Sequence, residues 1–155
     1  MDIYLLAKTV HVMSSTVLFG TGIGIAFFFL MGMRSGDPAA AWFAARTTAI
    51  ADMLFTLTAG IVQPLSGFLL VHLAGWDPFV PWLVATYAIY LAALACWLPV
   101  VWLQLQIRDM WARKLAGEAV DETLLARRFR WWFALGWPAF VGLTAVFYLM
   151  VAKPV

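Results

Sequence analysis

Lys8, His11 and His72 are the residues whose chemistry contrasts most with the apolar sequence around them. His11 follows Lys8 by three residues, and His72 is the only other histidine in the chain. Ionisable groups inside membrane-spanning helices are costly and mark functional sites. Imidazole is a common ligand for haem iron and other metals, so both histidines are candidate metal ligands. A catalytic zinc site with three histidines is excluded.

Small residues near His11 indicate how a flat ligand would approach it. Ser15 and Gly22 share a helical face with His11, and Gly20 and Gly24 form a G-x-x-x-G pair. A partly matching lane of small residues in the second apolar stretch contains Gly60, Ser66 and Gly67. A planar macrocycle between these two faces would have its metal within reach of His11. The alternative is that the small residues serve only close packing of helices.

Four long apolar stretches must position these residues. The chain is 65% hydrophobic and 12% charged, with a mean hydropathy of +0.90. Soluble domains are about half apolar and about a quarter charged. A membrane-spanning helix needs about 20 apolar residues. We predict spans at 3–33, 47–73, 81–107 and 131–151 within one domain, 1–155. Short connections make the fold an all-α, antiparallel four-helix bundle in the lipid bilayer.

The basic residues predict the orientation of this bundle. Eight of the ten lysines and arginines fall after the first and third spans: Arg34, Arg46, Arg108, Arg113, Lys114, Arg127, Arg128 and Arg130. Only Lys8 and Lys153 fall on the other side. Because cytoplasmic loops are rich in lysine and arginine, the polar segment 108–130 is expected in the cytoplasm and both termini outside it.

Several residues inside the spans need partners from other helices. Asp52 is expected to pair with a basic residue of another helix, because a lone carboxylate in lipid is costly. Pro64, Pro99 and Pro138 each remove a backbone hydrogen bond from their span. The carbonyl freed by each proline must find a donor, so these positions are expected to face neighbouring helices. The single cysteine, Cys96, excludes an internal disulfide.

Ordered phrases along the chain carry a resemblance to a known family. They are KTVHVMSSTVLFGTGIGIAFF (8–28), QPLSGFLLVHLAGW (63–76), PWLVATYAIYLAALACWLPVVWLQLQIRD (81–109) and WFALGWPAFVGLTAVFYLMVAKP (132–154). Together they resemble a family of predicted bacterial integral membrane proteins of unknown function. That family is distantly similar to the four-helix membrane protoporphyrinogen oxidases and to the membrane part of CopD-type copper-resistance proteins. The resemblance implies a multi-pass protein of the bacterial inner membrane.

The resemblance to the oxidases implies a ligand and also a difference. A Lys-x-x-His pattern opens their first helix, and the histidine is held to ligate haem b, so the corresponding residues here are Lys8 and His11. The oxidases carry a lysine soon after the tryptophan that opens the third span, where this chain reads PWLVATY (81–87). They also have an NE-P phrase where this chain reads WFALGWP (132–138). These departures argue against protoporphyrinogen oxidation and leave haem binding as the expectation.

Three functions follow from these observations. The first is haem b binding for electron transfer or an accessory redox role, with His11 as axial ligand and His72 as second ligand. Lys8, Ser15, Gly22 and Gly67 would line that site, with Lys8 near the haem propionates. The second is a non-catalytic subunit or assembly factor of a larger membrane complex, or a homodimer. The third, copper transport, is weaker, because the methionines do not cluster near either histidine. Nucleic acid binding is excluded, since no basic stripe alternates with exposed aromatics.

Overall fold

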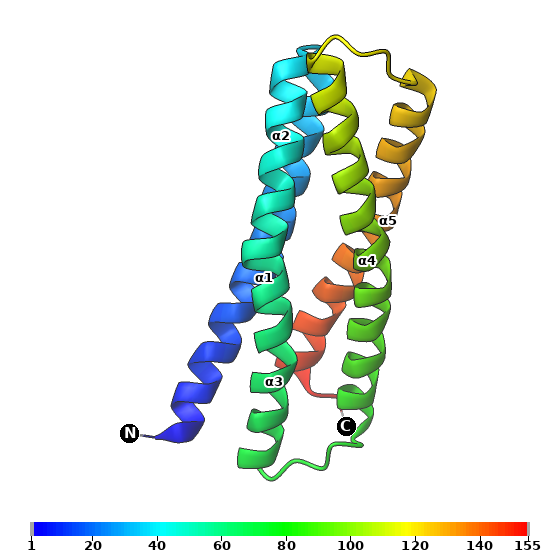
Figure 1. Ribbon diagram of the computed structural model, residues 1–155. Helices are drawn as coiled ribbons and strands as arrows, with labels where there is room; N and C mark the ends of the chain where they lie inside the picture. The colour runs from blue at the N-terminus through cyan, green and yellow to red at the C-terminus, as the bar shows by residue number, and fades with distance from the viewer. Residues whose placement is uncertain (1, 155) are drawn as a thin grey trace.

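The structure is a computed structural model that describes residues 2–154 (Figure 1). Its elements are α1 (Ile3–Arg34), α2 (Pro38–Ala51), the π-helical segment η1 (Asp52–Thr56), α3 (Leu57–Leu73), α4 (Pro81–Leu115) and α5 (Glu122–Ala152). Because α2, η1 and α3 follow one another without a break, they form one continuous helical rod, Pro38–Leu73. The four rods are long and apolar enough to cross a membrane. The predicted all-α bundle of four spans is confirmed.

Consecutive rods run antiparallel, so both termini lie at the same end of the bundle (Figure 1). The loop between α3 and α4 lies at this end as well, which we call the terminal end. The loops after α1 and α4 lie at the opposite end, which we call the loop end. The side of the membrane that each end faces stays a prediction from the distribution of basic residues.

The helices extend beyond the predicted spans at the loop end. The second rod begins at Pro38, and α4 continues to Leu115. Most of the polar segment 108–130 is therefore helical, and residues 116–121 form the link to α5. At about 1.5 Å per residue, α4 is about 50 Å long. The hydrocarbon core of a bilayer is only about 30 Å thick, so α4 reaches past it.

Two of the helices end in the same hydrogen-bonded motif. At the end of α3, the Gly75 N–H donates to the His72 carbonyl, and the Trp76 N–H donates to the Val71 carbonyl. Gly75 has a φ of 67°, a left-handed conformation that costs glycine little. Gly117, with a φ of 79°, ends α4 in the same way. In both motifs, backbone N–H groups beyond the helix end bond carbonyls of its last turns, and the chain then reverses direction.

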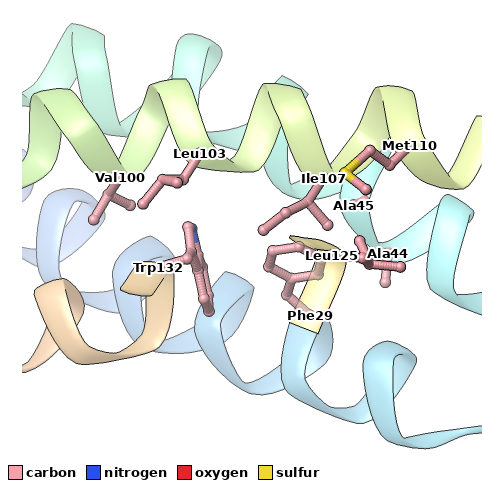
Figure 2. Packing of buried hydrophobic residues seen from close by; sticks show 9 residues of the cluster. All are labelled: Phe29, Ala44, Ala45, Val100, Leu103, Ile107, Met110, Leu125 and Trp132. Atoms are coloured by element: carbon pink, nitrogen blue, oxygen red, sulfur yellow. The ribbon is translucent and has the colours of Figure 1, made fainter. Parts of the chain in front are cut away.

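The core lies towards the loop end, where α1, α2, α4 and α5 meet (Figure 2). It consists of Phe29, Ala44, Ala45, Val100, Leu103, Ile107, Met110, Leu125 and Trp132. The Phe29 and Trp132 rings meet edge to face with centroids 4.6 Å apart. Gly32 allows α1 to approach α2, because a Cβ at this position would overlap the Ala44 methyl group. In lipid such tight packing is a main attraction between helices.

The carbonyl that Pro64 leaves free is paired by a neighbouring helix, as the sequence predicts. It lies inside α3 and cannot donate a hydrogen bond to the Gly60 carbonyl four residues earlier. The Tyr90 hydroxyl of α4 donates to this carbonyl instead. A side chain of another helix therefore satisfies the backbone group that Pro64 leaves free, which links α3 to α4.

Candidate functional site

His11 of α1 faces α3, where its ring contacts two polar side chains. Its Nδ1 is 3.0 Å from the Ser66 hydroxyl, and its Nε2 is 3.1 Å from the Gln63 amide nitrogen. The Ser14 hydroxyl donates to the amide oxygen of Gln63. Ser14 and Ser66 are both buried, and His11 is half-buried. We call these four residues the His11 cluster.

The hydrogen bonds of the His11 cluster favour one tautomer of the imidazole ring. The Ser66 hydroxyl donates to the Val62 carbonyl at 2.7 Å, so its oxygen accepts the Nδ1–H of His11. Nε2 then carries the lone pair and accepts from the Gln63 amide. Each member of the cluster has a partner of the correct kind. Both ring nitrogens are thus bonded to α3.

Spacing along two antiparallel helices explains why these residues meet. His11 and Ser14 are three residues apart on α1, and Gln63 and Ser66 are three residues apart on α3. Residues at this spacing share a helical face, so the two polar pairs oppose each other. Gly67 makes room for the ring, because a Cβ there would be only 3.2 Å from His11 Cε1. The small residue predicted to admit a ligand instead contacts the imidazole.

His72 does not join His11. It lies in the last turn of α3, is exposed and is six residues beyond Ser66. Six residues advance a helix by about 9 Å and turn it by about 240°. The side of α3 that carries His72 is therefore rotated away from the side that bonds His11. The predicted pair of histidines does not form one site in this arrangement.

The other predicted site residues lie around α1 without converging. Lys8 is exposed, with its Nζ 6.0 Å from the centre of the Tyr4 ring. The Ser15 hydroxyl donates to the Val12 carbonyl of its own helix at 2.8 Å. Gly22 has open space beside it, since a Cβ built there meets no described atom within 4 Å apart from its chain neighbours and the backbone of its own helix.

Asp52 forms a second polar cluster, deeper in the bundle. Asp52 is 2% exposed, and its carboxylate accepts from Gln104 Nε2 at 2.6 Å and from Trp97 Nε1 at 3.3 Å. Trp132 Nε1 donates to the Gln104 amide oxygen at 3.2 Å. We call these four residues the Asp52 cluster. The expectation that Asp52 pairs with a basic residue is wrong, because neutral donors of α4 hold it.

The Asp52 cluster coincides with the only π-helical segment in residues 2–154. Asp52 begins η1, in which the Leu57 N–H reaches back to the Asp52 carbonyl. π-Helical turns are rare and occur often at functional sites. Thr56 at the end of η1 is buried, and its hydroxyl has no partner in the described chain. The sequence signal for the cluster is Gln104, one of two amides, with Gln106, near the end of the third apolar stretch.

An apolar groove lies on the outer surface between α1 and the rod that contains α2 and η1. Its volume is about 580 Å³. The lining residues are Thr21, Gly24, Ile25, Phe28 and Gly32 of α1, together with Ala40, Phe43, Ala44, Thr47, Thr48, Ala51 and Phe55 of the second rod. Neither His11 nor Asp52 lines it. Within residues 2–154, no group of three or more His, Cys, Asp and Glu residues is placed to hold a metal ion.

The fold and the two buried polar clusters define a multi-pass helical membrane protein. Residues 5–154 match the model of a family described as predicted integral membrane protein, DUF2269, and the chain belongs to this family. No curated protein and no solved structure matches the chain. The comparisons therefore support the resemblance to a family of predicted integral membrane proteins. They give no support to a similarity with protoporphyrinogen oxidase or with CopD.

Proposed function

We propose that the protein is a non-catalytic transmembrane subunit whose groove between α1 and α2 receives a transmembrane helix of another membrane component. The observation that carries this proposal is the groove itself, which is open to the outside and about 580 Å³ in volume. Small residues stand on both of its walls, among them Gly24, Ala40 and Ala51. Small residues at helix interfaces in membranes allow two backbones to approach closely.

The polar interior supports the same function. His11 bonds α3 through both ring nitrogens, and Asp52 bonds α4 through both carboxylate oxygens. These contacts fix the rotation and the register of the helices, which keeps the two walls of the groove in place. Interhelical hydrogen bonds of this kind stabilise membrane bundles modestly, by about 0.6 kcal/mol each on average.

Site-specific photocrosslinking tests the occupant of the groove. A benzophenone amino acid replaces Phe28 or Phe43, which line the groove and are 67% and 60% exposed. The matched control replaces Leu98 of α4, which is 59% exposed and lies outside the groove. We expect the two groove positions to capture the same membrane protein in cells, and Leu98 to capture only lipid.

Gly24→Ile decides whether the captured protein occupies the groove. A Cβ at Gly24 meets no described atom within 4 Å outside its chain neighbours and its own helix backbone, so the larger side chain begins in open space beside the groove. The proposal requires this variant to fold normally and to lose the crosslinked partner. Capture of lipid alone at Phe28 and Phe43 refutes the proposal. An adduct of twice the mass of the chain would show that a second copy occupies the groove. The protein would then be a homodimer rather than a subunit of a larger complex.

Haem b binding is the second candidate, because Nε2 of His11 carries the lone pair that a haem ligand needs. Ser66 would hold the ring through Nδ1, as partners of ligating histidines commonly do. The Gln63 side chain would have to turn away from Nε2. Lys8, one turn from His11, is the cation available to a propionate. A clamp by His11 and His72 together does not fit the arrangement. Haem b on His11 would supply one-electron transfer.

Absorption spectroscopy separates the two candidates. The detergent-purified protein, expressed with ample haem, is measured oxidised and then reduced with dithionite, and haem is counted by the pyridine haemochrome assay. About one haem b per chain, lost in His11→Ala and retained in His72→Ala, would establish His11 as the single ligand. A colourless wild-type protein would leave His11 as a structural residue and remove the haem candidate.

A further inference from the structure

Basic residues of α4 and α5 near the loop end differ in their partners. Three residues of α4 form ion pairs, Arg108 with Asp109 at 2.7 Å, Arg113 with Glu118 at 2.9 Å and Lys114 with Glu122 at 2.6 Å, and Arg128 of α5 donates to Met110 Sδ at 3.1 Å. Arg127 and Arg130 of α5, in contrast, form no ion pair or side-chain hydrogen bond with any residue from 2 to 154. Two exposed guanidinium groups are therefore free for an anion.

These two arginines line a hollow together with Trp131 and Ala134. The hollow, which we call the arginine hollow, has a volume of about 320 Å³. Its four residues are at positions i, i+3, i+4 and i+7 of α5, so they lie along one face of the helix. From Arg127 to Ala134 the helix rises about 10 Å. The cations are at one end of the hollow, and a methyl group is at the other.

The arginine hollow lies where α5 changes from polar to apolar sequence. Arg127 and Arg130 precede the apolar stretch 131–151, and Ala134 is inside it. Trp131 stands at the boundary and is 58% exposed, as is typical of aromatic residues at the membrane interface. The hollow therefore extends from the level of lipid headgroups to the level of the acyl chains.

We propose that the arginine hollow binds the phosphate of an anionic phospholipid, with the glycerol and the start of an acyl chain over Ala134. Arginine binds phosphate oxygens in bidentate pairs, and basic pockets at membrane helices bind anionic headgroups. A free phosphate ion would use the two guanidinium groups and leave the apolar end of the hollow unfilled. A lipid satisfies both ends, which favours the lipid as the source of the phosphate.

Native mass spectrometry of the full-length protein with added phosphatidylglycerol measures this binding. Arg127→Gln with Arg130→Gln should weaken it by about 30-fold, about fivefold for each arginine near the membrane surface. The control, Arg108→Gln with Arg113→Gln, removes the same charge from arginines that are already paired. Equal weakening in both double variants would mean general electrostatic attraction and would overturn the proposal.

Two further measurements test the site itself. Ala134→Phe keeps every charge and fills the apolar end of the hollow, so it should weaken phosphatidylglycerol binding while helix content by circular dichroism is unchanged. No effect of this variant would overturn the proposal. Millimolar inorganic phosphate should leave the bound lipid in place. Displacement by inorganic phosphate would show that the hollow binds the free ion rather than a lipid.

Discussion

The His11 cluster and the Asp52 cluster both stabilise an ionisable side chain within the bundle, but they differ in how deeply they are buried. Both place an ionisable side chain inside a helical bundle and bond it to neutral groups of another helix. His11 is half-buried between two helices and packs against Gly67. Asp52 is 2% exposed and connects through Gln104 to Trp132, which belongs to the core.

The difference teaches that burial decides how much a polar contact matters. A donor left without a partner in a dry core costs its full desolvation energy, about 1–3 kcal/mol. A donor at a half-buried seam can turn to another acceptor or to water. We therefore expect the Asp52 cluster to hold the fold together, and the His11 cluster to adjust the contact of α1 with α3. The following variants test this contrast by unfolding in mixed micelles.

Trp132→Ala should have the largest effect, a loss of about 3–5 kcal/mol in the free energy of unfolding. The change leaves a cavity beside Phe29 and removes the donor to Gln104. Trp137→Ala is the control, because Trp137 is on the same helix and 55% exposed. A similar loss in both variants would show that the core does not centre on Trp132.

Asp52→Ala should cost about 1–3 kcal/mol, because the buried Gln104 amide and the Trp97 indole lose their acceptor. Asp52→Asn keeps one acceptor oxygen and should cost less. If Asp52→Ala lowers the free energy of unfolding no more than Ser66→Ala does, the two clusters do not differ in their importance for the fold.

A double-mutant cycle of His11→Ala and Ser66→Ala measures the coupling in the His11 cluster. We expect about 0.6 kcal/mol, and at most about 1.7 kcal/mol, as for other hydrogen bonds between membrane helices. The control cycle pairs His11→Ala with Thr58→Ala, whose hydroxyl bonds the Leu54 carbonyl of its own rod. A coupling as large in the control as in the test would mean that His11 and Ser66 do not interact.

Tyr90→Phe should cost about 0.6 kcal/mol, no more than the His11–Ser66 coupling, because it removes the donor to the Gly60 carbonyl. Pro64→Ala restores a backbone N–H that can bond this carbonyl. In the Pro64→Ala protein, Tyr90→Phe should therefore cost almost nothing. An undiminished cost in that background would show that Tyr90 acts in some other way than by pairing this carbonyl.

Much of the fold could be predicted because a lipid bilayer allows few backbone structures to span it. Four apolar stretches of sufficient length must become helices, since every backbone group needs an internal partner in the bilayer. The connections are short, so neighbouring helices are antiparallel and the termini share one end. The need of the carbonyl freed by Pro64 for an outside donor followed from the same rule, and Tyr90 meets it.

The candidate site was predicted less completely, because the sequence does not say which face of a spanning helix turns inward. Apolar residues cover the lipid-facing side as well as the core, so no polar stripe marks the solvent side as it does in soluble helices. Rotation about the helix axis decides that His11 meets Ser66 and that His72 points elsewhere. It also decides that Gly67 packs against the imidazole rather than admitting a macrocycle.

The sequence by itself determined that this is a helical membrane protein with four spans, and it identified His11 and Asp52 as groups in need of partners. Length and hydropathy settle the first point, and the cost of ionisable groups in lipid settles the second. Only the tertiary structure determined which residues bond His11 and Asp52. Gln63, Ser66, Trp97 and Gln104 come from other spans, and their contacts depend on register and rotation between helices, which local sequence does not encode.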